Sequence, residues 1–458
     1  MRLRLVRTSG FAAAILLLVV CSCAPAPSGP PNIVLIVIDT LRPDHLPFHG
    51  YQRDTAPFLA ELATKGVVFE HVQSTSSWTA PATASLLTSL HPVQHGVHSG
   101  LTAVRTQQQA DPTITLNRIP SEVATAAEIL KAGGYSTWGV ADNLNICSEL
   151  GFEQGFDHFR MTSDVGAAAV NATVRGWRNG IEEEGPYLLY LHYMDPHRPY
   201  LKRAPWYTPR DGELLDSISA YDSEISHVDR KIEELFELLR WDENTLIIVT
   251  SDHGEEFQDH GGWDHGRTLY AEVVDVPLVV YSSAVGCATT PAVGSSGAAV
   301  SGAAADQASG GIRRVMESVS ILDVLPTMRD AAGLSVGEAE QGVSLLPVIT
   351  GEADAPAGRS FHAELRSPPW FGSLTLHSVT RERQKYILTL PDAEELFDLT
   401  RDPEERESLV DRRRDAVTAF RAELAEFLES VPRYAAGTVD ISLDAETREQ
   451  LESLGYMQ

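Results

Sequence analysis

The sequence predicts an α/β fold in which a mainly parallel sheet is covered by helices on both faces. Three short apolar runs, residues 32–38, 187–192 and 245–250, show no alternation with polar residues, which is typical of strands buried on both faces. The segments between them contain helical patterns, and acidic residues follow each run. Because ligands of such sheets bind beyond the carboxyl ends of the strands, we expect a functional site there.

The length and composition of the chain predict one large domain with a smaller addition. The 458 residues are 43% hydrophobic, which is enough to bury a substantial core. Sixty-three acidic residues against thirty-six basic ones give a formal net charge of −27. This charge opposes binding to nucleic acid or anionic lipid headgroups, so we expect neither as a partner.

The N-terminus predicts export. Basic residues precede an apolar run over residues 11–20, which is too short to span a bilayer, so residues 1–22 are interpreted as a signal peptide. Cys23 follows a small residue and is the predicted lipidation site; the alternative is an ordinary secretory signal cut nearby. Residues 23–31 form a Pro-rich tether. A periplasmic or cell-envelope location follows, with membrane contact only through this lipid.

Helical signals separate the predicted strands. Ser121 is in position to cap a helix that runs to Ala132 and stops at Gly133. Residues 216–240 predict a long surface helix, because one apolar face recurs at steps of four and three residues. That face consists of Tyr221, Ile225, Val228, Ile232, Leu235 and Leu239.

Composition divides the chain after the tether into two parts. Residues 32–350 form the predicted catalytic domain, interrupted at 282–311 by a stretch rich in Ala, Gly, Ser, Val and Thr that we interpret as a flexible insertion. The phrase RRVMESVSILDVLPTM then predicts a strand followed by a helix. Residues 351–458 predict a C-terminal subdomain, a small antiparallel sheet with a helix at 415–428. The remaining cysteines, Cys147 and Cys287, form no recognisable disulfide pattern.

Three residues past the ends of two buried strands predict a metal site. Asp39 follows the first strand, and Asp252 and His253 follow the third. Carboxylate oxygens and an imidazole nitrogen are suitable ligands for a divalent cation. Taken singly, such residues more often cap a helix or form an Asx turn. Their joint placement favours the metal.

Thr79 is the candidate nucleophile. It lies in the phrase SSWTAPATASLLTSLHPVQHGV, where Pro81 and an Ala-, Ser- and Leu-rich run predict a helix beginning near Thr79. The N-terminus of a helix favours an anion, and a metal-bound hydroxyl there has a lowered pKa. Alone, Thr79 would be an ordinary helix cap.

Five phrases occur in an order that resembles the sulfatase family of the alkaline phosphatase superfamily. They are NIVLIVIDTLRPDHLPFHGY, SSWTAPATASLLTSLHPVQHG, YLHYMDPHRPY, VTSDHGEEFQDHGGWDHGRTLYAEVVDVPLVV and EELFDLTRDPEERESLV. The resemblance implies an alkaline-phosphatase-like sheet and a divalent metal, commonly calcium, on Asp39, Asp252 and His253. It places Thr79 at the nucleophile position. It also implies that His197 and His265 contact the ester group of a small-molecule or glycan substrate, or its leaving oxygen.

The chain departs from the family pattern at the nucleophile. Sulfatases carry Cys or Ser in Cys/Ser-x-Pro-x-Arg, which matures to formylglycine, whereas this chain reads Thr79-Ala80-Pro81-Ala82-Thr83. The second metal-binding aspartate is replaced by Thr40, and the Lys-Trp-His phrase is replaced by residues 140–144, VADNL. These changes remove positive groups that would stabilise a transferring sulfate.

Three hypotheses follow, because the chain keeps most motifs of the family but departs from its nucleophile pattern. The first is a metal-dependent sulfate ester hydrolase. The second is a phosphoesterase or phosphotransferase that uses Thr79 as nucleophile, as phosphate-handling relatives do, with zinc or manganese and with a second metal on Asp195, His197 and His265. The third is an inactive, lipid-anchored protein that binds anionic glycans.

Overall fold

A computed structural model describes residues 29–100, 113–162, 166–283, 311–366, 374–435 and 437–442. The predicted signal peptide, Cys23 and most of the tether lie outside these residues, as do Cys287 and nearly all of the predicted insertion. Cys147 is buried and forms no disulfide within the described part of the chain. None of the described helices is both long enough and apolar enough to span a membrane.

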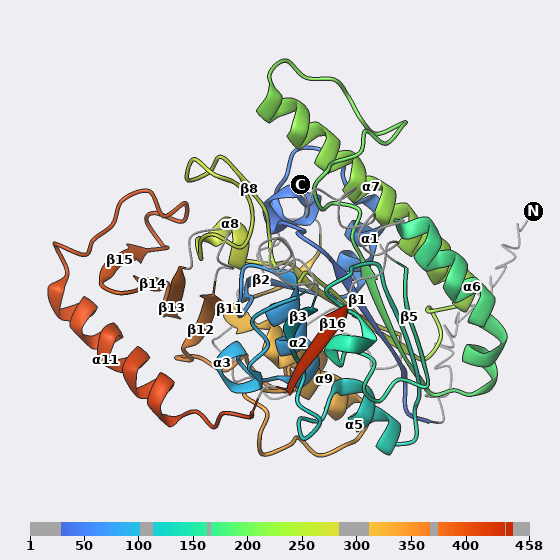
Figure 1. Ribbon diagram of the computed structural model, residues 1–458. Helices are drawn as coiled ribbons and strands as arrows, with labels where there is room; N and C mark the ends of the chain where they lie inside the picture. Colours follow the sequence, from blue (N-terminus) through green and yellow to red (C-terminus); the bar gives the residue numbers. More distant parts are fainter. Residues whose placement is uncertain are drawn as a thin grey trace, which may run out of the picture.

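An eight-stranded, mainly parallel sheet forms the centre of the molecule, as predicted (Figure 1). Only one strand, β10, runs antiparallel to its two neighbours. In spatial order the strands are β11 (Arg313–Ser320), β2 (Val67–Gln73), β10 (Leu278–Ser282), β7 (Thr245–Thr250), β1 (Asn32–Ile38), β6 (Tyr187–Tyr193), β4 (Ser136–Ala141) and β5 (His158–Met161). The three predicted strands are therefore the adjacent central strands β7, β1 and β6.

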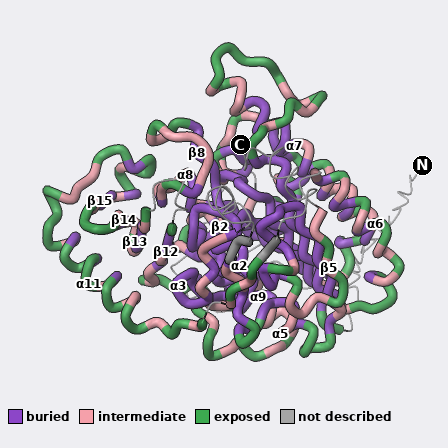
Figure 2. Tube along the Cα trace, in the orientation of Figure 1, coloured by how far each residue is buried: buried purple, intermediate pink, exposed green. Residues whose placement is uncertain are grey.

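Helices cover both faces of this sheet because the residues of its central strands are apolar on both sides. Ile33, Leu35 and Val37 of β1 belong to one core, which is covered by α2 (Thr79–Thr88), α5 (Ala126–Ala132) and α9 (Val324–Ala331). Val34, Ile36 and Ile38 belong to a second core, which is covered by α1 (Pro57–Lys65), α6 (Ala167–Glu183) and α7 (Glu213–Leu239). Figure 2 shows the buried residues concentrated between these layers.

Two predicted helix boundaries shift in the structure. The helix expected to begin at Ser121 is α5, and its N-cap is Thr125, whose hydroxyl accepts from the Glu128 backbone N–H while the Glu128 carboxylate accepts from the Thr125 N–H. The reciprocal pair satisfies two free donors, so Ser121 was the wrong cap. The long helix α7 begins at Glu213, one turn early, and ends before Arg240, which adopts a left-handed conformation.

The C-terminal subdomain is the predicted small antiparallel sheet with one helix packed on it. Its strands are β12 (Phe361–Arg366), β13 (Thr375–Arg381), β14 (Gln384–Thr389) and β15 (Ala393–Asp398), and its helix is α11 (Arg414–Ser430). A separate core joins the two layers through Val379, Tyr386, Leu396, Val417, Phe420 and Leu424. The chain then returns to the large domain, where β16 (Gly437–Ser442) pairs with β3 (Thr113–Arg118), a pairing that the sequence did not indicate.

Short elements complete the described part of the chain. The short helices are η1 (Pro43–His45), η2 (Pro47–His49), α3 (Pro92–His95), η4 (Ser148–Leu150), α8 (Ala271–Val274), η5 (Ile321–Asp323) and α10 (Leu346–Thr350). A two-stranded ribbon of β8 (Glu256–Phe257) and β9 (Trp263–Asp264) lies in the loop after β7, in the same segment as the predicted site residues.

Candidate active site

Strand register brings the predicted metal ligands to one edge of the sheet. Val37 of β1 pairs with His192 of β6 and with Thr250 of β7. Asp39 and Asp252 each lie two residues beyond this level, and side chains two residues apart on an extended chain point to the same side. The same side of the sheet is covered by α2, which begins at Thr79.

Asp39, Asp252 and His253 converge within this edge. His253 Nε2 lies 3.4 Å from Asp39 Oδ1 and 3.6 Å from Asp252 Oδ2. One ligand atom from each residue lies within 4.8 Å of the other two, and in the described part of the chain no other set of His, Cys, Asp or Glu residues is as compact. All three side chains are fully buried.

The unused atoms of these residues fit a divalent cation. Asp39 Oδ1 and Asp252 Oδ2 are buried and accept no hydrogen bond, although unpaired buried carboxylate oxygens are costly. His253 Nδ1 donates to the Gly254 carbonyl at 2.9 Å, so Nε2 of the neutral ring carries no hydrogen and has a lone pair. Two unpaired oxygens and one nitrogen lone pair at this spacing are the donors that a cation requires.

The charges inside the cluster are unbalanced without a cation. Burial and the charge of Asp39 raise the pKa of Asp252 well above its usual value. Burial opposes ionisation of Asp39 too, but the hydrogen bond from His192 and the neighbouring histidines lower its pKa below the usual range. Burial also lowers the pKa of His253 to about 3, which keeps its imidazole neutral and able to ligate. A bound dication would allow both carboxylates to ionise together.

Thr79 lies beside this cluster. It is the first residue of α2, after an extended Trp78, and it is 2% exposed. Its hydroxyl oxygen lies 3.4 Å from Asp39 Oδ2 and 3.3 Å from His253 Nε2. The structure therefore brings the predicted nucleophile and the three predicted ligands together.

His197 and His265 lie on loops next to the same cluster. The His265 ring centroid is 4.4 Å from that of His253 and 4.9 Å from that of His197. His265 Nδ1 lies 3.0 Å from Glu255 Oε1; although burial opposes protonation of His265, this carboxylate raises its pKa. Burial and the neighbouring His265 lower the pKa of His197. The pKa values of these two neighbouring histidines are thus shifted in opposite directions.

Asp195 does not join the histidines, so the hypothesised second metal site was wrong for this structure. Asp195 Oδ2 accepts from the Ala167 N–H at 2.7 Å, at the start of α6, and Oδ1 pairs with Arg203 at 3.1 Å. Its oxygens are therefore occupied by a helix N-terminus and a guanidinium. Within the described residues, Asp195, His197 and His265 do not form a compact ligand set.

Two polar residues of the site were missed as functional candidates. Asn143 Nδ2 donates to Asp39 Oδ2 at 2.7 Å, and His192 Nε2 lies 3.1 Å from the same oxygen. Asn143 is two residues beyond Ala141, which pairs with His192 in the sheet. The alternation of side chains along β6 was the signal that could have found His192, whereas Asn143 is brought to the site only by the alignment of β4 with β6. Asn143 lies within residues 140–144, which replace the Lys-Trp-His phrase expected from the sulfatase family.

One basic side chain lies at the rim of the site. Arg198 directly follows His197, and its Nη1 lies 2.8 Å from Asp264 Oδ1, the residue before His265. The Arg198 guanidinium also lies over the Trp263 ring, 5.9 Å from its centroid, and its side chain is 50% exposed. This ion pair links the two histidine loops and offers a cation next to the site.

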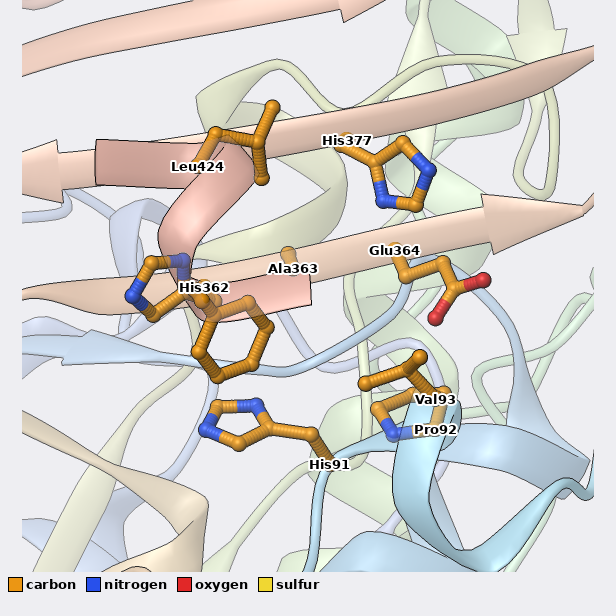
Figure 3. A pocket seen from close by; sticks show the side chains of 9 residues that line it. His91, Pro92, Val93, His362, Ala363, Glu364, His377 and Leu424 are labelled. Carbon is orange, nitrogen blue, oxygen red and sulfur yellow. The ribbon is translucent and has the colours of Figure 1, made fainter. Parts of the chain in front are cut away.

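A separate pocket lies where the C-terminal subdomain meets the large domain (Figure 3). It is lined by residues of α3, β12, β13 and α11 and by His91, which directly precedes α3. Its polar groups are His91, His362, His377 and Glu364, and His362 stacks on Phe427 at 3.8 Å. Burial lowers the pKa of His91 to about 3 and that of His362 to about 4, so these rings are neutral packing groups.

Comparisons with known proteins find relatives over most of the chain. The choline-sulfatase of Rhizobium meliloti (strain 1021) is 24% identical over 478 residues, covering 86% of each chain. The structure of a 2-O GAG sulfatase has a TM-score of 0.69 and 18% identity, over 87% of this chain and 92% of that chain. The phosphonate monoester hydrolase of Agrobacterium radiobacter has a TM-score of 0.65 and 17% identity, over 90% and 97%.

These likenesses confirm the predicted alkaline-phosphatase-like fold, with its mainly parallel sheet, flanking helices and small antiparallel sheet. The Sulfatase family model matches residues 31–334, which contain the three predicted metal ligands, Thr79 and both active-site histidines. The match covers about two thirds of the chain. The chain therefore belongs to the sulfatase family.

Proposed function

We propose that this chain cleaves sulfate esters at the cluster of Asp39, Asp252, His253 and Thr79. As a member of the sulfatase family it is a hydrolase of sulfuric esters. The observation that carries the site assignment is that two buried carboxylate oxygens without hydrogen-bond partners face one imidazole nitrogen, with a hydroxyl 3.3 Å from that nitrogen. The enzymatic hypothesis is therefore preferred to the inactive binding protein.

Asp39 Oδ1, Asp252 Oδ2 and His253 Nε2 are the proposed ligands of a divalent cation. When bound, the cation supplies positive charge that lowers the pKa of a hydroxyl and polarises an ester oxygen. Calcium is the cation that the family resemblance favours for sulfate esters. An imidazole ligand and few protein oxygens are more typical of zinc or manganese, which we propose if phosphate esters are the substrate.

Side chains of this chain are proposed for the nucleophilic attack, the protonation of the leaving oxygen and the binding of the ester group. Thr79 Oγ, or a water in its place, is the proposed nucleophile, and His253 Nε2 lies 3.3 Å from it. His265 is the proposed acid that protonates the leaving oxygen, because Glu255 raises its pKa. His197, whose pKa is lowered and whose Nδ1–H donates to the Arg198 carbonyl at 2.6 Å, is proposed to contact the ester group as a neutral imidazole with Nε2 as an acceptor. The substrate is proposed to be a small-molecule or glycan sulfate.

The second candidate is a phosphoesterase or phosphotransferase. It is favoured by one observation, that position 79 carries threonine, which cannot mature to formylglycine. A threonine hydroxyl can form a phosphate ester and release it to water or another acceptor. Labelled phosphate recovered on Thr79 would decide for this candidate.

Three substrates assayed in parallel test the proposal: an aryl sulfate, an aryl phosphate monoester and a phosphate diester. Metal content is measured on the same preparation. We expect the aryl sulfate to be turned over fastest, with activity lost in Thr79→Val and on chelation of the metal. A metal-loaded protein that turns over neither sulfate nor phosphate would contradict the proposal.

The matched control for Thr79→Val is Thr88→Val. Thr88 is at the other end of the same helix, is 3% exposed, and donates to the Ala84 carbonyl at 2.7 Å. Its substitution removes one buried hydrogen bond, worth about 1 kcal/mol, and should leave turnover unchanged. Equal losses in both variants would mean that Thr79 acts only through the stability of α2.

Export with lipidation of Cys23 completes the proposal. A basic start, an apolar run and Cys23 after Ser22 support it. Mass spectrometry of the mature N-terminus in a bacterial host would find a lipid-modified Cys23 that Cys23→Ala lacks. An unmodified N-terminus at another residue would instead support an ordinary secretory signal.

A further inference from the structure

We infer that His192 and Asn143 are positioning residues that restrict Asp39 to binding the cation through one oxygen, with Tyr190 holding His192 in the required tautomer. The inference rests on the proposed function, because it assumes that Asp39 binds a cation.

The two oxygens of Asp39 are in different environments. Asp39 Oδ2 receives the Asn143 amide at 2.7 Å and lies 3.1 Å from His192 Nε2. Asp39 Oδ1 accepts no hydrogen bond and lies 3.4 Å from His253 Nε2. Two donors on one oxygen therefore leave only the other facing the proposed cation.

Asp39 and Tyr190 contact opposite nitrogens of His192. Tyr190 Oη lies 3.1 Å from His192 Nδ1, and both side chains are fully buried. Burial and the charges of Asp252 and Asp39 raise the pKa of Tyr190 well above its usual value, so its hydroxyl remains a donor. Because the ionised Asp39 carboxylate can only accept, a neutral His192 carries its hydrogen on Nε2 and donates it to Asp39 Oδ2, 3.1 Å away. Nδ1 then accepts from the Tyr190 hydroxyl, which stabilises this tautomer.

The network is anchored on three adjacent strands. His192 of β6 pairs with Val37 of β1 and with Ala141 of β4, and Asp39 and Asn143 follow these two strands. Asn143 Oδ1 accepts from the Asn145 N–H at 2.8 Å, which fixes the direction of its amide. Since none of these side chains is on the surface, rotation of the Asp39 carboxylate would break buried hydrogen bonds.

Binding of the metal alone tests this inference. Dissociation constants for calcium and zinc are measured by competition with a chromophoric chelator, after thermal unfolding has shown that each variant is folded. We expect His192→Phe to weaken binding by about 10- to 100-fold, the range for outer partners of metal ligands. His192→Gln, whose amide can still donate to Asp39, should recover part of the loss. Tyr190→Phe should weaken binding less than His192→Phe.

Tyr193→Phe is the matched control. Tyr193 is on the same strand, is fully buried, and its hydroxyl donates to Asn171 at 2.9 Å on the opposite side of the sheet. It loses the same hydroxyl as Tyr190→Phe but should bind the metals as the unmodified protein does. Unchanged dissociation constants in folded His192→Phe and Tyr190→Phe would overturn the inference alone. An unmodified protein that binds neither cation would overturn the proposed function as well.

Discussion

Two clusters of buried carboxylates differ in how their oxygens are paired: Asp39 and Asp252 follow β1 and β7, and Asp195, which follows β6, lies near Glu224 of α7. In the first, Asp39 and Asp252 each keep one oxygen without a partner and have no Lys or Arg partner among the described contacts. In the second, Asp195 and Glu224 are paired with Arg203 at 3.1 and 2.7 Å. Other buried carboxylates with an unpaired oxygen, such as Glu340 and Glu364, still have an arginine partner. The comparison therefore supports the proposal that Asp39 and Asp252, which have none in the described part of the chain, require an external cation.

The largest expected effect comes from Asp252→Asn. We expect loss of metal binding and a fall of turnover to background, because the substitution removes a charged ligand. In the presence of a chelator the variant should be at least as stable as the unmodified protein, because the raised pKa of Asp252 already favours its neutral form without a cation. Denaturant unfolding with and without metal measures both the loss of metal binding and the stability of the variant under chelation. If Asp252→Asn were less stable than the unmodified protein in the presence of a chelator, the Asp252 carboxylate would be stabilising without a cation, as Asp195 is, and the two clusters would not differ.

A smaller effect of the opposite kind is expected from Arg203→Met. It leaves Asp195 and Glu224 buried without their cation, and breaking such a pair costs about 3–5 kcal/mol when fully buried. The Arg203 side chain is 28% exposed, so solvent screening reduces the expected loss of unfolding free energy to about 1–3 kcal/mol. Metal affinity should not change. A lost metal site in the folded variant would show that the two clusters are coupled.

The smallest effect is a dependence of stability on pH. Burial raises the pKa of Asp195 to about 6 and that of Glu224 to about 7, in spite of Arg203. The folded protein then holds protons that the unfolded chain has released, so the contribution of these two groups to stability is lost as the pH rises through 6 and 7. Denaturant unfolding across this range should show the decrease, and Glu224→Gln should reduce it. If the stability of the unmodified protein did not change across this pH range, the raised pKa values of Asp195 and Glu224 would be contradicted.

The sequence predicted the parts of the molecule that depend on local pattern. The strands 32–38 and 245–250 stood out because they are apolar on both sides, and their ends located Asp39 and Asp252. The start of α2 at Thr79 followed from Pro81 and the small residues after it.

What the sequence missed depends on contacts between distant segments. The role of Asn143 comes from the alignment of β4 with β6, which no local pattern determines. Asp195 resembled a ligand in chain order, yet the start of α6 and Arg203 occupy its oxygens. The return of β16 to pair with β3 likewise depends on the whole fold.

The edge strand β12 of the C-terminal sheet contacts the segment that precedes Thr79, the proposed nucleophile. The Glu364 N–H donates to the Thr75 carbonyl at 2.9 Å, and the Ser76 hydroxyl donates to the Glu364 carbonyl at 2.7 Å. A truncation after residue 350 would strip these partners from the polypeptide three residues ahead of Thr79. We therefore expect a shortened protein to retain the proposed metal ligands but to lose two of the hydrogen bonds that hold the segment before Thr79 in place.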